Sequence, residues 1–267
     1  LTTSGFRPFE TVISVEMDSA AHATLRLRAF LRAHLSREGA FPSGYAAFHR
    51  NFDPPAGAGL VVPDWSADPL WAQSENEARC LTLGTSEARL SLGDAIASAK
   101  KRFDDTVVIG GPPCQAYSLV GRARNRGVLG YRAEDDHRHF LFREYIAVLK
   151  ALHPAVFIME NVKGMLSSSV GGQRVYDMLM EDLRSLGGEE GDLYELVPLA
   201  PRTMLADAAQ DFVIEAENHG VPQRRHRVII LGIRHDVAAC WRSRGGRSDR
   251  ALLKSSPRAT VRHLLGG

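Results

Sequence analysis

Residues 106–115 read TVVIGGPPCQ, and this stretch decides the fold class and points to a site. The apolar, β-branched run 106–109 is typical of a buried strand, and the glycines and prolines after it end that strand in a turn. Ligands of open α/β sheets bind at the carboxyl ends of strands. We therefore expect Cys114 to face a cleft, on a loop that leaves a strand of the sheet.

Two later stretches bring further reactive groups to strand ends. Residues 157–162 read FIMENV, which predicts a second strand that ends near a carboxylate, Glu160. Residues 223–227 read QRRHR and lead into an apolar run at 228–231, which predicts a third strand. Together the three stretches supply a nucleophile, an acid and a cluster of guanidinium groups.

The composition is that of an ordinary globular chain. Its 267 residues, 44% of them hydrophobic, suffice for one large domain or for one domain and part of another. The sequence has no apolar run of the ~18 residues that a membrane span needs and no secretory pattern at its start, so we expect a cytoplasmic location and no membrane partner. Three cysteines are too few and too scattered for a disulfide framework or a CxxC metal site, and we expect no metal.

Charge alone does not indicate nucleic acid, because the net charge is only +2. The basic residues are concentrated, however, at 122–126 and again at 242–262. Local positive surface is what phosphate contacts require. Solvated loops are an equally good interpretation of the second cluster taken by itself.

Expected strands and helices alternate along the chain, which predicts an α/β fold with a doubly wound, mostly parallel sheet and helices on both faces. Residues 36–76 lack a clear period and are rich in Gly, Pro and Asp, so we expect an irregular insertion there. We expect Ser86 to cap the second helix and Asp18 to cap the first. The expected strands lie at 11–16, 79–83, 106–109, 157–160, 193–199 and 228–231, and the expected helices at 20–34, 86–102, 139–152 and 175–186.

At these residues the chain resembles the cytosine-C5 DNA methyltransferases of the bacterial type. Pro-Cys-Gln, Glu-Asn-Val and Gln-Arg-Arg occur here in the order of that family's motifs IV, VI and VIII, and the resemblance runs from about Gly5 to the last residues. It implies a Rossmann-like class I methyltransferase fold with a catalytic domain at 1–256. The family's Gly-rich motif I is not found in residues 1–4, and 257–267 is similar to the transition into a target-recognition domain, so we expect both to lie outside the given sequence.

The chemistry of cytosine explains why these residue types belong together. C5 becomes nucleophilic once a thiolate adds to C6, and Cys114 is the candidate, with Arg225 or Arg227 expected to favour its thiolate. We expect Glu160 to hydrogen-bond N3 of the base with a carboxyl that is protonated or shares a proton with the ring, which requires a pKa raised by burial. The resemblance implies that Arg225 and Arg227 hold the cytosine O2 and a phosphate, while Arg224 points away. The alternatives are an inert buried cysteine, a Glu160 that caps a helix starting near residue 162, and an ordinary basic surface.

The resemblance also implies S-adenosylmethionine as methyl donor, with S-adenosylhomocysteine as product. Glu16 would accept hydrogen bonds from the ribose and Met17 would pack on the adenine. Leu83 and Gly84 occupy the place of the family's adenine-reading acidic residue, so that contact falls to the backbone unless Asp94, within an expected helix, supplies it. The residues expected to line the rest of the cofactor pocket are Pro113 and Leu141.

Other residues are expected to handle the nucleic acid. Asn161 is expected to orient the neighbouring loop, and residues 117–131 form an arginine-rich loop suited to closing over a flipped nucleotide. The implied partner is double-stranded DNA, with a cognate restriction endonuclease as functional partner, and we expect a monomer. An RNA cytosine methyltransferase and a non-catalytic nucleic-acid-binding subunit are the alternatives. The expected substrate-binding residues are Gln115, Ser118, Asn161 and Gln223.

Overall fold

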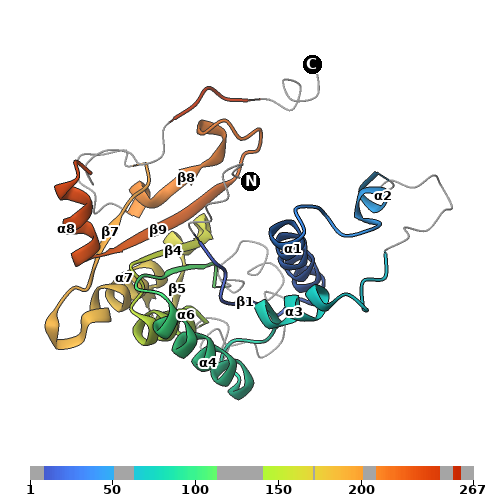
Figure 1. Cartoon of the computed structure of the whole chain (residues 1–267). Helices are drawn as coiled ribbons and strands as arrows, with labels where there is room; N and C mark the ends of the chain where they lie inside the picture. Colours follow the sequence, from blue (N-terminus) through green and yellow to red (C-terminus); the bar gives the residue numbers. More distant parts are fainter. Residues whose placement is uncertain are drawn as a thin grey trace, which may run out of the picture. The chain divides into compact units, whose positions relative to one another are not determined.

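The protein is described by a computed structural model, which covers residues 9–50, 63–112, 141–170, 172–200, 209–246 and 255–259. These residues fall into two compact units that divide between Ala99 and Lys100 (Figure 1). Within the described ranges, no helix has the length and apolar character needed to cross a membrane. The first unit contains a two-stranded sheet and the second a five-stranded sheet, and each unit is described by itself.

The first unit begins with a strand followed by a helix, as the sequence predicts. Asp18 caps the helix, because its side chain accepts a hydrogen bond from Ala21 N at 2.8 Å. The strand β1 pairs in parallel with β2, with Glu16 opposite Cys80. The bounds of these elements are β1 Ser14–Glu16, α1 Ser19–Arg37, α2 Tyr45–Arg50, α3 Pro69–Glu77, β2 Ala78–Cys80 and α4 Ser86–Arg102.

Two expectations for this unit are wrong. Residues 36–76 are not irregular throughout, because α2 and α3 lie within them; Asp68 caps α3 by accepting from Leu70 N at 2.8 Å. The cap of α4 is Thr85 rather than Ser86, since the Thr85 hydroxyl accepts from Ala88 N at 3.2 Å. A small aromatic core explains why α3 folds here: the ring of Phe30 in α1 is fully buried against those of Trp65 and Trp71.

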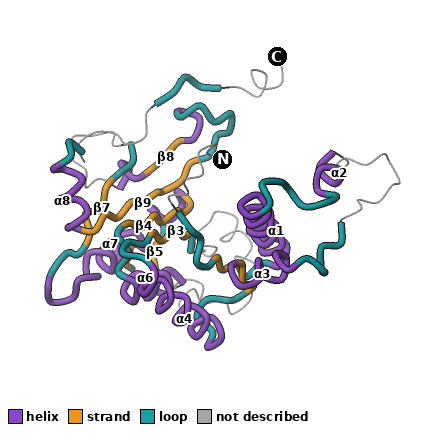
Figure 2. The backbone as a smooth tube through the Cα atoms, in the orientation of Figure 1, coloured by secondary structure: helices purple, strands orange, loops and turns teal. Residues whose placement is uncertain are grey.

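The second unit contains a five-stranded mixed sheet in the order β3-β4-β9-β7 (Figure 2). The fifth strand, β8, pairs with the first residues of β9, whereas β7 pairs with its last residues. Only β3 and β4 are parallel; β9 runs antiparallel to β4, β7 and β8. The α/β class is confirmed, but the expectation of a mostly parallel sheet does not hold for this unit. One reason is that β8 returns into β9 through residues 216–225, a connection that antiparallel pairing permits without a crossover helix. The strands are β3 Val107–Gly110, β4 Val156–Val162, β7 Tyr194–Val197, β8 Val213–Glu215 and β9 His226–Arg234.

Helices cover both faces of this sheet, as predicted. Phe157 and Met159 of β4 are fully buried in a core that includes Leu149 of α6 and Leu179 of α7. The alternate residues of β4 face a smaller cluster around Ala238 of α8. Figure 1 shows α6 and α7 on one side of β4 and α8 against β7 and β9. The remaining elements are α6 Leu141–Leu152, η3 Lys163–Ser167, β5 Ser169–Val170, β6 Gln173–Arg174, α7 Val175–Arg184, η4 Ser185–Glu190, η5 Ala209–Phe212, η6 Ala216–Asn218 and α8 His235–Ser243.

Candidate active site

The chain leaves β3 through a space too narrow for side chains. A Cβ atom on Gly110 would lie 2.4 Å from Cε2 of Tyr145, whose hydroxyl donates a hydrogen bond to Ile158 O at 3.1 Å. A Cβ on Gly111 would lie 3.2 Å from Oε2 of Glu160. The two glycines therefore let the chain pass close to Tyr145 and then to Glu160, and they bring the start of the Cys114 loop beside the Glu160 carboxylate.

Asn161 fastens this loop to β4. The residue is only 5% exposed; its Nδ2 donates to Pro112 O at 3.1 Å, and its Oδ1 accepts from Val162 N at 2.8 Å. Pro112 precedes Cys114 by two residues, so the amide acts close to the expected nucleophile. This is the arrangement expected of a side chain that orients the loop, while a contact between Asn161 and substrate stays a prediction.

Glu160 and Arg227 form the centre of the site. Glu160 Oε1 lies 2.7 Å from Nε of Arg227 and 3.9 Å from Nη2 of Arg225. The register of β4 and β9 produces the shorter contact: Val162 is opposite Arg227 and Glu160 is opposite Ile229, so Glu160 and Arg227 are diagonal neighbours on one face.

The surroundings of Glu160 differ from the expectation in two respects. Its side chain is 41% exposed and Arg227 pairs with it, so the expectation that this carboxyl is buried is wrong. Nor does Glu160 cap a helix, because β4 continues to Val162, which precedes η3 without a side-chain cap. The carboxylate faces solvent and the two guanidinium groups, a position from which it can reach a ligand.

The side chains of residues 224–227 alternate between two carboxylates. Arg225 and Arg227 turn to Glu160, whereas His226 Nε2 lies 2.9 Å from Oε1 of Glu217, and Arg224 Nε lies 4.0 Å from the same atom. The prediction that Arg224 points away from Arg225 and Arg227 is confirmed. Sequence reasoning missed Glu217, since it lies nine positions before His226 and belongs to no strand or motif.

Gln223 takes part in the turn before β9 through its backbone. Its N–H donates to Val221 O at 2.8 Å, and its carbonyl accepts from Arg225 N at 2.9 Å. The side chain is exposed, so a role in binding substrate stays a prediction.

In the first unit, the expected ribose contact lies at the end of β1. Oε1 of Glu16 accepts from the N–H groups of Met17 and Asp18 at 2.8 and 2.9 Å, which fixes the carboxylate just beyond the strand. The Met17 side chain is 59% exposed and is free to pack on a planar ligand. Gly84 has a φ of +89° in the turn after β2, a conformation that glycine adopts readily, and Asp94 lies within α4 as expected.

Several expected site residues lie outside the described residues. These are Pro113, Cys114, Gln115, Ser118 and the arginine-rich loop 117–131. Leu141 begins α6, but its side chain is not among those described. Their roles stay predictions from the sequence.

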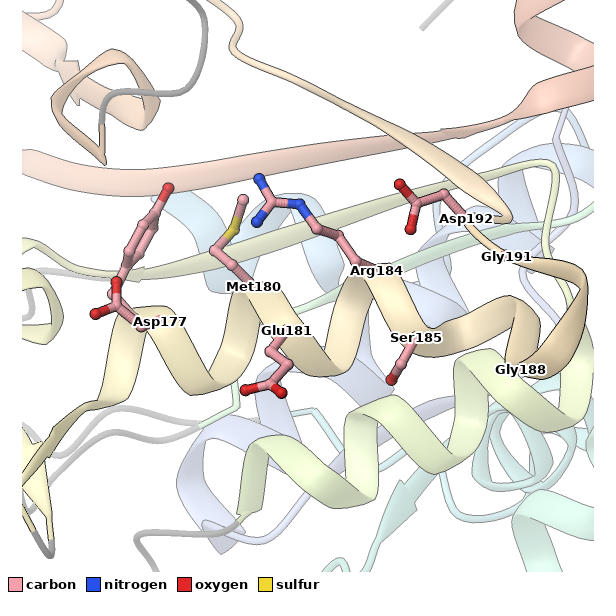
Figure 3. A pocket seen from close by; sticks show the side chains of 9 residues that line it. Asp177, Met180, Glu181, Arg184, Ser185, Gly188, Gly191 and Asp192 are labelled. Atoms are coloured by element: carbon pink, nitrogen blue, oxygen red, sulfur yellow. The ribbon is translucent and has the colours of Figure 1, made fainter.

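A surface hollow of about 500 Å³ lies elsewhere, along α7 and the turn after it (Figure 3). Figure 3 shows Asp177, Glu181, Arg184 and Asp192 around it. It contains none of the residues that the sequence predicts for the site, and its lining is dominated by acidic and small residues. A hollow of this character does not suit a nucleic acid, so the candidate active site remains the meeting point of β3, β4 and β9.

Comparison with known proteins agrees with this geometry. The sequence profile of the C-5 cytosine-specific DNA methylases matches residues 60–254, which includes the Cys114 loop, Glu160 and the arginines 224–227. The chain belongs to this family. The motif order that the sequence predicts and the contact between Glu160 and Arg227 are thus found in a member of the C-5 cytosine-specific DNA methylases.

Curated relatives give the same result over parts of the chain. A Type II methyltransferase, M.Bpa9945I of Bacillus paralicheniformis, is 37% identical over 47% of this chain and 24% of its own length. M.XorII of Xanthomonas oryzae pv. oryzae, also a Type II methyltransferase, is 34% identical over 62% of this chain and 34% of its own. The DNA (cytosine-5-)-methyltransferase M.ApeKI of Aeropyrum pernix is 30% identical over 61% of this chain and 32% of its own length. The chain therefore spans only about a quarter to a third of the length of these relatives.

Proposed function

We propose that this chain carries the catalytic residues of an enzyme that transfers a methyl group from S-adenosylmethionine to C5 of cytosine in double-stranded DNA. The observation that carries the proposal is the meeting of three parts at one sheet edge. Glu160 is held by Arg227 on one side, the backbone of Gly111 passes it on the other, and Asn161 binds Pro112 immediately before the nucleophile loop. The covalent chain allows about 7 Å between Pro112 and a residue two positions later, so Cys114 is within reach of a base bound at Glu160.

The proposed reaction uses these residues in sequence. The Cys114 thiolate adds to C6 of the cytosine, and the displaced electron pair makes C5 nucleophilic. A proton shared between the Glu160 carboxyl and N3 offsets the negative charge that develops there, while Arg227 holds O2 and keeps the carboxyl in place. When bound, S-adenosylmethionine supplies an electrophilic methyl group. Loss of the C5 proton to a base then expels the Cys114 thiolate and restores the aromatic ring.

The described residues of the first unit fit the proposed cofactor. Glu16 has one carboxylate oxygen engaged by two backbone N–H groups, and Oε2 has no hydrogen-bond partner among the described residues, as a ribose diol would require of its acceptor. Met17 offers an exposed thioether face for an adenine ring. The resemblance adds Leu83, Gly84, Pro113 and Leu141 to this set.

The proposal also includes the domain organisation, the oligomeric state, the location and the functional partner of the protein. We propose that residues 1–256 act as a catalytic domain and 257–267 as the start of a recognition region. The protein would act as a monomer in the bacterial cytoplasm, with a restriction endonuclease that cuts the same sequence as functional partner. The names of two relatives, both Type II methyltransferases, support the proposed restriction endonuclease as functional partner.

Methyl transfer by the full-length protein tests the proposal. Tritiated S-adenosylmethionine is offered with duplex DNA and, separately, with transfer RNA. We expect label at C5 of cytosine in DNA only, and we expect Glu160→Gln to lower the single-turnover rate far more than the affinity for the cofactor. Transfer to RNA alone, or binding of DNA without transfer, would replace the proposal by an RNA methyltransferase or a binding subunit.

A further inference from the structure

A second carboxylate, Glu217, holds the arginine segment from the face opposite Glu160. Glu217 accepts a hydrogen bond from His226 at 2.9 Å, and His226 stands between the two residues that turn to Glu160. In an extended segment, alternate side chains lie on opposite faces, so a hold on His226 also fixes the direction of Arg225 and Arg227. A shift of one position would turn His226 toward Glu160 and both arginines away from it.

Backbone pairing supports only the second half of this segment: His226 pairs with Glu215 of β8, and Arg227 pairs with Ile214 of β8 and with Val162 of β4. Residues 221–225 belong to no strand or helix, and β9 begins only at His226. The carbonyl of Arg225 accepts from Ala216 N at 3.0 Å, which continues the pairing of β8 with β9, and the N–H of Arg225 donates to Gln223 O at 2.9 Å within the turn. The contact of His226 with Glu217 therefore adds to strand pairing in fixing the side-chain directions at the start of β9, above all that of Arg225, which precedes the strand.

Glu217 suits this task because it is nearly buried and firmly placed. Its side chain is 11% exposed. The hydrogen bond from His226 lowers the pKa of Glu217 below its ordinary value, and the charge of Arg258 contributes less to this lowering. The remaining oxygen, Oε2, is buried and has no hydrogen-bond partner among the described residues. A buried carboxylate with one engaged oxygen depends strongly on that one partner, which favours a single arrangement of the pair.

A separate segment of the chain braces the residue that follows Glu217. Asn218 donates to Oε2 of Glu215 at 2.9 Å and accepts from Arg258 Nε at 3.2 Å, and its carbonyl accepts from Ser256 N at 2.8 Å. Residues 255–259 are thereby joined, through η6, to the start of β9. This segment therefore contacts the residue next to the carboxylate that holds His226.

We infer that Glu217 is a positioning residue of the methyl-transfer site, which acts through His226 to keep Arg225 and Arg227 on the Glu160 face. The inference rests on the proposed function for its effect on rate, but its structural content is independent of it. Two carboxylates on opposite faces thus fix one four-residue segment, with Glu160 facing the base and Glu217 facing the protein. Residues 255–259 support the second carboxylate and give it a connection to the C-terminal part of the chain.

The test compares matched variants of the full-length protein. Glu217→Ala and His226→Ala remove either partner, whereas His226→Gln keeps an N–H donor for Glu217. Glu195→Gln is the control, because Glu195 also pairs with a histidine, His235 at 3.7 Å, and with an arginine, but at the other end of β9. Two quantities are measured: the single-turnover rate of methyl transfer, and the NMR signal of the Arg227 Nε–H in protein labelled with ¹⁵N at arginine Nε.

We expect Glu217→Ala and His226→Ala to lower the rate about tenfold to a hundredfold, the loss typical of a small misplacement of catalytic groups, with cofactor affinity unchanged. The double variant should lose no more than the worse single variant, and Glu217→Ala should add nothing in a Glu160→Gln background. His226→Gln should restore most of the rate, which a general loss of stability would not allow. The Arg227 signal should be present in wild type and Glu195→Gln, and lost in Glu217→Ala.

The two proposals fail in different ways. If wild type and Glu195→Gln transfer no methyl groups, the proposed function fails, and the Arg227 signal alone decides the positioning role: its loss in Glu217→Ala supports that role and its persistence overturns it. If wild type is active, an unchanged rate in Glu217→Ala overturns the positioning role. Equal rates in His226→Ala and His226→Gln would overturn it as well.

Discussion

Replacing Asn161 should damage the site more than it damages the fold. Asn161→Ala removes the donor to Pro112 O and the acceptor of Val162 N, at 3.1 and 2.8 Å. A buried backbone group that loses its partner costs about 1–3 kcal/mol, and the half-buried N–H of Val162 costs about 1 kcal/mol, so we expect a loss of about 2–4 kcal/mol in the free energy of unfolding. A domain with ~5–15 kcal/mol of stability remains folded after that loss, and its rate can be measured.

The effect on rate follows from where Pro112 lies. Without the amide, nothing among the described side chains fixes the Pro112 carbonyl beside β4, and we expect the single-turnover rate to fall at least tenfold. Asn161→Asp should be no better, because it sets a carboxylate oxygen against the Pro112 carbonyl while it keeps the shape of the side chain.

Tyr194→Phe provides the matched control. Like Asn161, Tyr194 makes a buried hydrogen bond to a proline carbonyl, since its hydroxyl donates to Pro154 O at 2.8 Å, but this bond lies just before β4, away from the candidate site. Urea unfolding should show a loss of about 1 kcal/mol for this variant, and its rate of methyl transfer should be normal. Stability and rate are measured on the same samples, with rates corrected for the folded fraction. A normal corrected rate in Asn161→Ala would refute the view that this amide positions the nucleophile loop.

Two further predictions concern the fold. Gly232→Ala would put a Cβ 2.0 Å from the Phe157 ring, and we expect a loss of about 1–3 kcal/mol or more in urea unfolding; an unchanged midpoint would contradict the packing of β4 against β9. The hydrogen bond from His34 lowers the pKa of Asp68, so the stabilisation from this carboxylate is present above its ordinary pKa of about 3.9 and is lost as the pH falls through the lowered value. Asp68→Asn keeps a good helix cap but does not titrate. Its stability, followed by the fluorescence of Trp65 and Trp71, should therefore fall less than that of wild type as the pH is lowered through and below about 3.9. Equal acid sensitivity of the two proteins would count against the ion pair.

The sequence predicted those parts of the fold in which local pattern and tertiary packing agree. The apolar runs at 106–109 and 228–231 lie in β3 and β9, and Asp18 caps α1 as expected. The helix α3 was missed because glycine and proline around it hid the Asp68-Pro69 start signal. Three-residue β8 carries too short a pattern to recognise, and its pairing with β9 depends on a turn that places Val213 opposite Val228.

The sequence predicted which residues form the site but not how their side chains are arranged. Motif order brought Glu160, Arg225 and Arg227 together, and the alternation of side chains set Arg224 apart. Only the register of β4 and β9 shows that Glu160 lies two residues before the strand end, exposed and paired with Arg227. Glu217 could not be predicted, because its contact with His226 is made across a turn that has no sequence signature of its own.

Covalent trapping tests the central claim most directly. The full-length protein is incubated with S-adenosylmethionine and duplex DNA that carries 5-fluorocytosine at the target base; fluorine at C5 prevents the loss of a proton, so the thiolate cannot be expelled. We predict a stable protein–DNA adduct in which peptide mapping places the bond on Cys114, and Cys114→Ala should form none while it stays folded. An adduct on Cys80 or Cys240, or an adduct that persists in Cys114→Ala, would contradict the assignment of the nucleophile and the mechanism built on it.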